Sequence, residues 1–135
     1  MRYLHSTNGL LPLARYSPGV EIAAGERLVI CSGQLGVCAD GRVPESVREQ
    51  TLQCLENAEA ILKSADLDRS HVIKLTAYVT DRSCLPDYMV ARDAFFHDQP
   101  EPPASTLLIV SGFSRPEFSV EVEVIAAATS FKEGQ

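Results

Sequence analysis

The sequence has no run of basic residues, no paired cysteines and no apolar run long enough to span a membrane. Its formal net charge is −6, which disfavours a nucleic-acid backbone as partner. Basic and aromatic residues do not alternate in the sequence, so it offers no sign of a surface on which bases could stack. The longest apolar runs fall well short of the roughly 20 residues that a transmembrane helix needs. We therefore expect neither nucleic acid nor a membrane as partner.

The cysteines also lack any pairing that would indicate a metal or redox motif. Cys31, Cys38, Cys54 and Cys84 form no C-x-x-C pair, which excludes a zinc ribbon or a thioredoxin-like motif. Free, mostly buried thiols are the favoured interpretation, and they fit a reducing compartment. The N-terminal segment does not resemble a secretory signal. Together these absences predict a cytoplasmic location.

Several common catalytic motifs are missing as well. The chain has neither a G-x-x-x-x-G-K-[ST] phosphate loop nor a G-x-S-x-G nucleophile elbow. Its histidines, His5, His71 and His97, are far apart and lack metal-ligand spacing, so they are interpreted as surface or helix-end residues. The sequence predicts no metal site.

What is present is the composition of one globular domain, covering residues 1–135. Apolar residues at helical spacing predict helices over 46–64 and 85–98. Strand-like runs cover 20–23, 27–31, 72–80, 104–110 and 118–127, and a further short strand resumes near Val37 and stops at Asp40-Gly41. The order β-β-β-α-β-α-β-β predicts an α/β (α+β) domain in which both helices cover one face of a mixed sheet.

Three finer expectations follow from this pattern. Segments 20–23 and 27–31 flank Gly25 and are predicted to form a hairpin, with 27–31 covered on both faces. Residues 130–135 are expected to fray. The helix-free face of the sheet needs a cover, and a subunit interface is the simplest one.

The last strand carries the most informative charges. Val120, Val122 and Val124 alternate with Glu121 and Glu123, so one face is apolar and the carboxylates point to the other. A carboxylate within an apolar strand is either satisfied at an interface or used on a ligand. Glu121 is thus a candidate general acid or base that activates water.

Several motifs together resemble the YjgF/RidA family, the reactive-intermediate deaminases. They are Ser32-Gly33-Gln34, Ala94-Phe95-Phe96, Pro103-Ala104-Ser105-Thr106 and Val120-Glu121-Val122-Glu123. The likeness runs in order over residues 16–127. It implies a chorismate-mutase-like fold and a homotrimer whose sheets form a central barrel, with ligand clefts between neighbouring subunits. It also implies hydrolysis of enamines and imines to a keto acid and ammonia, with no metal and no organic cofactor.

The resemblance carries over to individual residues, with one departure. Glu121 matches the glutamate that positions water, Tyr16 matches a tyrosine that closes the site, and Ser32-Gly33-Gln34 matches its backbone segment. The position of the arginine that binds the substrate carboxylate is Ser105, followed by Thr106. A serine hydroxyl contributes about 1 kcal/mol, less than a charged bidentate pair.

Arg15 and Arg115 are the candidates for a basic residue that compensates for Ser105. The leading hypothesis is a divergent hydrolase of the deaminase type, acting on a small imine, enamine or related carbonyl-nitrogen compound. Two alternatives stay open: a non-catalytic trimer that binds a small metabolite, and an endoribonuclease. The acidic charge argues against the endoribonuclease.

Overall fold

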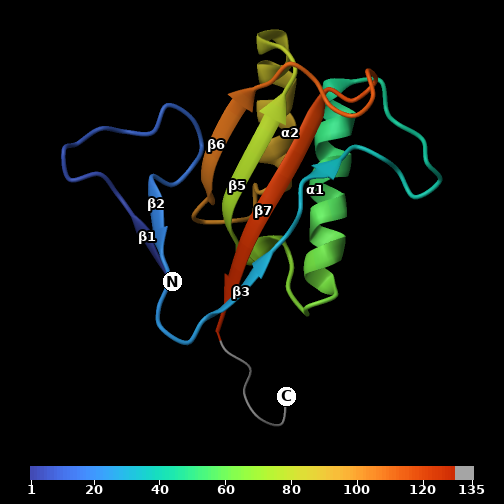
Figure 1. Ribbon diagram of the computed structural model, residues 1–135. Helices are drawn as coiled ribbons and strands as arrows, with labels where there is room; N and C mark the ends of the chain where they lie inside the picture. The colour runs from blue at the N-terminus through green and yellow to red at the C-terminus, as the bar shows by residue number, and fades with distance from the viewer. Residues whose placement is uncertain (130–135) are drawn as a thin grey trace.

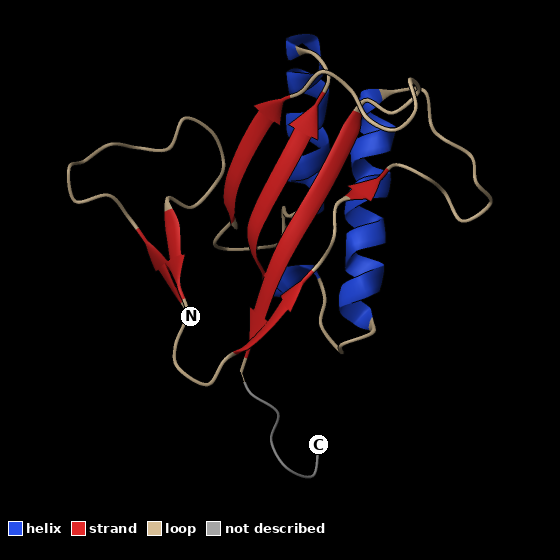
Figure 2. Ribbon diagram, viewed as in Figure 1, coloured by secondary structure: helices blue, strands red, loops and turns tan. Residues whose placement is uncertain are grey.

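A computed structural model describes residues 1–129 and shows a mixed sheet with two helices packed on one face (Figure 1 and Figure 2). The helices are α1 (Val47–Lys63) and α2 (Leu85–Phe95). The strands are β1 (Arg2–Leu4), β2 (Gly19–Glu21), β3 (Arg27–Ile30), β4 (Gln34–Leu35), β5 (Val72–Val79), β6 (Ala104–Ile109) and β7 (Val120–Ala128). Short 3-10 turns, η1 (Arg69–His71) and η2 (Arg82–Cys84), precede β5 and α2.

The predicted fold class is confirmed, because both helices lie behind the same sheet (Figure 1). The main sheet has the order β3-β7-β5-β6, and β4 pairs with the first part of β7. β5 and β6 are parallel because α2 connects them by a crossover, whereas β7 is antiparallel to its neighbours. Within residues 1–129 the sheet stays open and does not close into a barrel. Residues 130–135, expected to fray, lie outside the described part.

The predicted hairpin around Gly25 is wrong. Gly25 does adopt a positive φ of 86°, but β2 pairs with β1 and β3 pairs with β7. A turn does form at Gly25, as its position in the sequence indicated. All four residues of β3 pair with the long β7, whereas β2 has only three residues that could pair with it. The predicted strand near Val37 is also displaced, since β4 ends at Leu35 and the chain then turns.

The expectation that 27–31 is covered on both faces fails within the described chain. Leu28 and Ile30 are 48% and 75% exposed, because both helices cover only the other face. On the covered face, Val122 and Val124 from β7 and Leu75 from β5 are almost fully buried. They pack in one core with side chains from α1 and α2. The sheet therefore has an apolar buried side and an open side.

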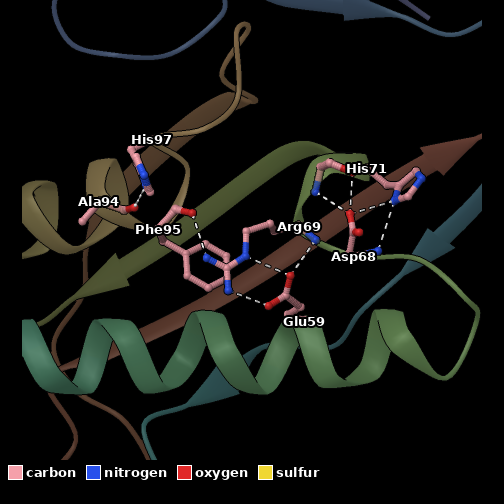
Figure 3. A network of polar contacts seen from close by, with 8 residues as sticks. Glu59, Asp68, Arg69, His71, Ala94, Phe95 and His97 are labelled. Atoms are coloured by element: carbon pink, nitrogen blue, oxygen red, sulfur yellow. Dashed lines mark hydrogen bonds and ion pairs between the residues drawn. The ribbon is translucent and has the colours of Figure 1, made fainter.

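A polar cluster around Arg69 links α1 to the end of α2 (Figure 3). Arg69 donates to both carboxylate oxygens of Glu59 on α1, at 2.8 and 2.9 Å, and to the Phe95 carbonyl on α2 at 3.1 Å. Two of the histidines, predicted to be surface or helix-end residues, lie beside it. His71 is the last residue of η1 and accepts from the Asp68 backbone N–H, and His97 is exposed just after α2, against the Ala94 carbonyl. No helix among residues 1–129 combines the length and apolar content that crossing a membrane requires.

Candidate functional site

Glu121 lies on the open face of the sheet, near the start of β7. Its register partner on β5 is Tyr78, and Glu123 is paired with Thr76, so the carboxylates share this face. The Tyr78 hydroxyl donates a hydrogen bond to Glu123, and this bond raises the pKa of Tyr78 above its usual value. Glu123 is thereby engaged within the sheet. The carboxylate of Glu121 has a different neighbour.

Gly33 lies directly against the Glu121 carboxylate. A Cβ added at Gly33 would be 2.1 Å from Glu121 Oε1, so only glycine leaves room for the carboxylate in this position. The pairing of Gln34 with Val122 and of Leu35 with Glu121 holds the segment there. The structure therefore brings the predicted backbone segment, Ser32-Gly33-Gln34, together with Glu121. The Gln34 side chain donates back to the Ser32 carbonyl at 3.0 Å.

Two amide side chains of α1, Asn57 and Gln50, hold the backbone segments on either side of Glu121 in place. The sequence analysis identified neither of them. Asn57 donates to the carbonyls of Leu35 and Val37, at 3.1 and 3.0 Å, and so anchors the segment that contains β4. Gln50 is buried; it donates to the Glu117 carbonyl and accepts from the Ser119 backbone N–H, both at 2.9 Å. Residues 50 and 57 are two turns apart on the same side of α1, a spacing that could have identified them.

Cys54 lies on the same side of α1, one turn after Gln50. Its thiol contacts the Val120 carbonyl at 3.6 Å. Burial, with the Glu121 charge as a smaller cause, raises the pKa of Cys54 to about 12. A thiol with that pKa is protonated at neutral pH and is not a nucleophile. This supports the interpretation of the cysteines as mostly buried free thiols, which holds for Cys31 and Cys84 as well.

Ser105 belongs to a second cluster, on the helix side of the sheet. Its register partner is Leu75, a core residue, so the Ser105 side chain points toward α2. It lines a narrow hollow with six other residues: Arg15, Arg92, Asp93, Phe96, Pro102 and Pro103. Arg15 reaches this hollow because Ser17 bonds to the Pro103 carbonyl and lays the N-terminal segment beside β6. Arg15 also donates to the Gln99 carbonyl at 2.6 Å.

The other predicted residues lie outside these two clusters. Tyr16 is next to Arg15, and its hydroxyl accepts from the Leu13 backbone N–H within its own loop. Thr106 is on the open face, where it accepts from Lys74 Nζ at 2.6 Å. Arg115 stacks on Phe118 at 4.6 Å in the loop before β7 and is half exposed. Of the two arginine candidates, Arg15 is the one that shares a hollow with Ser105.

Arg92 is the functional candidate that sequence reasoning missed. It lies on α2 and is only 4% exposed. Its guanidinium is 5.7 Å from the Tyr88 ring centroid, and Nε donates to Asp93 at 3.1 Å. The spacing of Arg92 in the sequence could have identified it. It lies four residues after Tyr88 and three before Phe95, which places it on the buried side of the helix.

In one chain, the two clusters do not form a single site. Glu121 is paired with Tyr78 on the open face, whereas Ser105 is paired with Leu75 on the helix face. Successive strand residues alternate between faces, so partners three residues apart on β5 lie on opposite sides of the sheet. Each chain thus carries two candidate half-sites: a carboxylate over Gly33 and a hollow with basic residues between α2 and β6.

The fold is that of the Rid proteins, as comparisons with solved structures show. A crystal structure of the Rid-family protein YyfB from Yersinia pestis, of unknown function, has a TM-score of 0.83 at 25% identity, covering 94% of this chain and 98% of that one. A structure of E. coli TdcF with bound serine has a TM-score of 0.71 at 25% identity, covering 96% and 100%.

The sequence comparisons give the family itself. A protein from Salmonella typhimurium named 2-iminobutanoate/2-iminopropanoate deaminase is 31% identical over 121 residues, covering 88% of this chain and 91% of that protein. The model of the family described as Endoribonuclease L-PSP matches residues 6–128, and the chain belongs to this family. The predicted relationship to the YjgF/RidA proteins is confirmed.

Proposed function

We propose that this protein hydrolyses a small imine or enamine to a carbonyl compound and ammonia. The observation that carries the proposal is the Glu121 carboxylate held against Gly33, in a position that a side chain at residue 33 would block. The name of the Salmonella typhimurium relative, a 2-imino acid deaminase, supports the same class of reaction.

The reaction needs only water and a proton carrier. Glu121 accepts a hydrogen bond from a water molecule and orients its oxygen toward the imine carbon. The oxygen forms a bond to that carbon, and one water proton passes through the carboxylate to the imine nitrogen, which gives a carbinolamine. The hydroxyl proton then passes through the same carboxylate to the amine nitrogen as the C–N bond breaks and the C=O bond forms. Ammonia leaves, and the carbon retains the oxygen as a carbonyl. No electrons are gained or lost, so the reaction requires no redox partner.

The two half-sites act together when they belong to neighbouring subunits of a homotrimer. The open face of the sheet supports this assembly, because Leu28, Ile30 and Leu108 are 48%, 75% and 44% exposed on it. Exposed apolar side chains gathered on one face are typical of a protein interface. In such a trimer, Glu121 of one subunit faces the hollow beside Ser105 of the next.

The direct test is turnover of 2-aminoacrylate generated in situ, followed by release of keto acid. We expect the wild-type protein to accelerate release above the buffer rate, and Glu121→Gln to lose about a hundredfold or more of this rate, because the amide cannot accept the proton. Glu123→Gln is the matched control, since that carboxylate is on the same face but is bonded to Tyr78. A wild-type rate equal to buffer, or full activity in Glu121→Gln, would contradict the proposal.

The same variants separate the alternatives. A non-catalytic protein that binds a small metabolite would show no turnover in any variant and unchanged ligand affinity in Glu121→Gln. A ribonuclease would degrade RNA after rigorous removal of contaminating nucleases. The net charge of −6 makes that the disfavoured result.

A further inference from the structure

The Glu121 carboxylate has no hydrogen bond or ion pair to hold it among residues 1–129. Because the residue is half-buried, the groups packed around it decide which rotamer it adopts. On one edge of β7 the neighbour is Gly33, which lies so close that an added Cβ would be 2.1 Å from Glu121 Oε1. The other edge of β7 pairs with β5, so the second neighbour that confines the carboxylate comes from that strand.

Tyr78 of β5 occupies this second position. It is the register partner of Glu121, and such partners stand on one face of the sheet with Cβ atoms about 4.5–5.5 Å apart. Its hydroxyl donates a hydrogen bond not to Glu121 but to Glu123, two residues further along β7. A diagonal contact of this kind is within reach of an aromatic side chain. The Tyr78 ring is therefore fixed at its far end, on the face where both carboxylates stand.

The charges on the open face agree with this arrangement. The bond with Glu123 is the main cause that raises the pKa of Tyr78, and the charge of Glu121 adds a smaller rise. Tyr78 is thus a neutral donor at neutral pH and lies within electrostatic range of both carboxylates. The basic residue on this face of β5, Lys74, donates to the Thr106 hydroxyl at 2.6 Å and leaves Glu123 to Tyr78.

We propose that Tyr78 is a positioning residue that confines Glu121 against Gly33, and that Glu123 serves to fix the Tyr78 ring. Without the fixed ring, Glu121 can rotate toward β5, where its carboxylate points away from Gly33. A carboxylate with one orientation directs the attacking water along one path, and a loss of orientation lowers the rate. The effect on the rate rests on the proposed function; the confinement of Glu121 does not.

The first test compares two substitutions of Tyr78. Tyr78→Phe keeps the ring and removes the bond, so we expect turnover of 2-aminoacrylate to fall about threefold. Tyr78→Ala also removes the ring and should cost about tenfold or more. Tyr3→Phe is the matched control, because Tyr3 lies on β1, outside the main sheet, and should keep wild-type turnover. Wild-type turnover in Tyr78→Ala would overturn the proposal.

A double variant shows whether Tyr78 acts through its bond with Glu123. Glu123→Leu removes the acceptor and should lower turnover as much as Tyr78→Phe does, whereas Glu123→Gln keeps an acceptor oxygen and should retain the rate. Combining Tyr78→Phe with Glu123→Leu should cost no more than either change alone, because both break the same bond. Losses that multiply in the double variant would overturn the proposed role of Glu123.

The position of Glu121 is a readout that does not depend on activity. We expect crystal structures to show its carboxylate against Gly33 in the wild-type protein and turned toward β5 in Tyr78→Ala. If Tyr78→Ala fails to fold, Tyr78→Phe takes its place, with Glu121 in more than one orientation as the expected result. Glu121 held against Gly33 alone in the variants that fold would overturn the proposal.

Position and turnover together distinguish this inference from the proposed function. A protein in which Tyr78→Ala releases Glu121, but whose wild type does not accelerate 2-aminoacrylate hydrolysis, would contradict the deaminase and leave the confinement established. Conversely, turnover that depends on Glu121 but is unaffected by Tyr78→Ala would contradict the role of Tyr78 alone.

Discussion

Gly33 and Gly36 are three residues apart, but a methyl group added to each would meet a different kind of neighbour. At Gly33 it would meet the Glu121 carboxylate, the end of a flexible side chain, at 2.1 Å. At Gly36 it would meet the backbone carbonyl of Gln50 at 2.9 Å, inside α1. A side chain can rotate away, whereas a helix backbone cannot.

We therefore predict opposite outcomes for the two alanine substitutions. Gly33→Ala displaces Glu121 and abolishes most turnover, with a small change in the free energy of unfolding. Gly36→Ala lowers that free energy by about 1–3 kcal/mol, because α1 and β4 must separate. Chemical denaturation and turnover assays check the pair. Equal loss of stability in both variants would contradict this account of Gly33.

At the residue scale, the family resemblance assigned Glu121 and the segment containing Gly33 to one site, and the structure places the two in contact. The alternation of β7 gave the face of Glu121, and the family motif gave the segment. Arg92 was missed because a single arginine on a helix normally indicates a solvated position. Its burial depends on Tyr88, Ser105 and the N-terminal segment, which are far apart in sequence.

At the scale of elements, the helices were predictable and the strand pairing was not. The bounds of α1 follow from local signals: Ser46 accepts from the Glu49 backbone N–H at 3.1 Å, and Ser64 ends the helix. Pairing of β3 with β7 joins residues almost a hundred positions apart, and no local pattern specifies it. The prediction for α2 extended to residue 98, beyond its end at Phe95.

The cap of α1 gives a prediction at this scale. Ser46→Ala removes the acceptor for the Glu49 backbone N–H and should lower the free energy of unfolding by about 1 kcal/mol. Ser46→Asp retains an acceptor and should lose little. Equilibrium unfolding in urea measures both variants, and an unchanged stability in Ser46→Ala would show that this cap contributes nothing.

The bridge between Glu59 and Arg69 makes stability depend on pH. Its hydrogen bonds with Arg69 hold the pKa of Glu59 below the ordinary value of 4.5. The native state thus favours the ionised carboxylate. The bridge stabilises the folded state fully at a pH above the ordinary pKa of Glu59, and this stabilisation is lost as the pH falls through the lowered pKa.

We expect Glu59→Gln to lower the free energy of unfolding by about 1–2 kcal/mol at neutral pH and to flatten its decline in acid. Glu56→Gln, an exposed position on the same helix, is the control and should retain the wild-type slope. Urea unfolding at several pH values between neutrality and strong acid measures the slopes. A slope in Glu59→Gln identical to wild type would show that the bridge does not set the acid stability.

At the scale of the whole molecule, the helix-free face of the sheet exposes apolar side chains that nothing in a single chain covers within residues 1–129. The homotrimer proposed above would cover this face, and it predicts a trimer mass by light scattering at micromolar concentration. Ile30→Lys places a charge on the most exposed of them and should shift the protein toward monomer, with loss of turnover. A wild-type monomer would contradict the shared site.

The most direct test of the account is complementation between two inactive variants. Glu121→Gln retains the hollow with Arg92, and Arg92→Met retains the carboxylate over Gly33. Produced together with different affinity tags and purified as mixed oligomers, they form some interfaces in which both half-sites are intact. If the site is shared between subunits, turnover of 2-aminoacrylate should return to about a third of the wild-type rate per subunit, because a mixed trimer of either composition has one intact interface out of three. Mixed oligomers as inactive as either parent would contradict it.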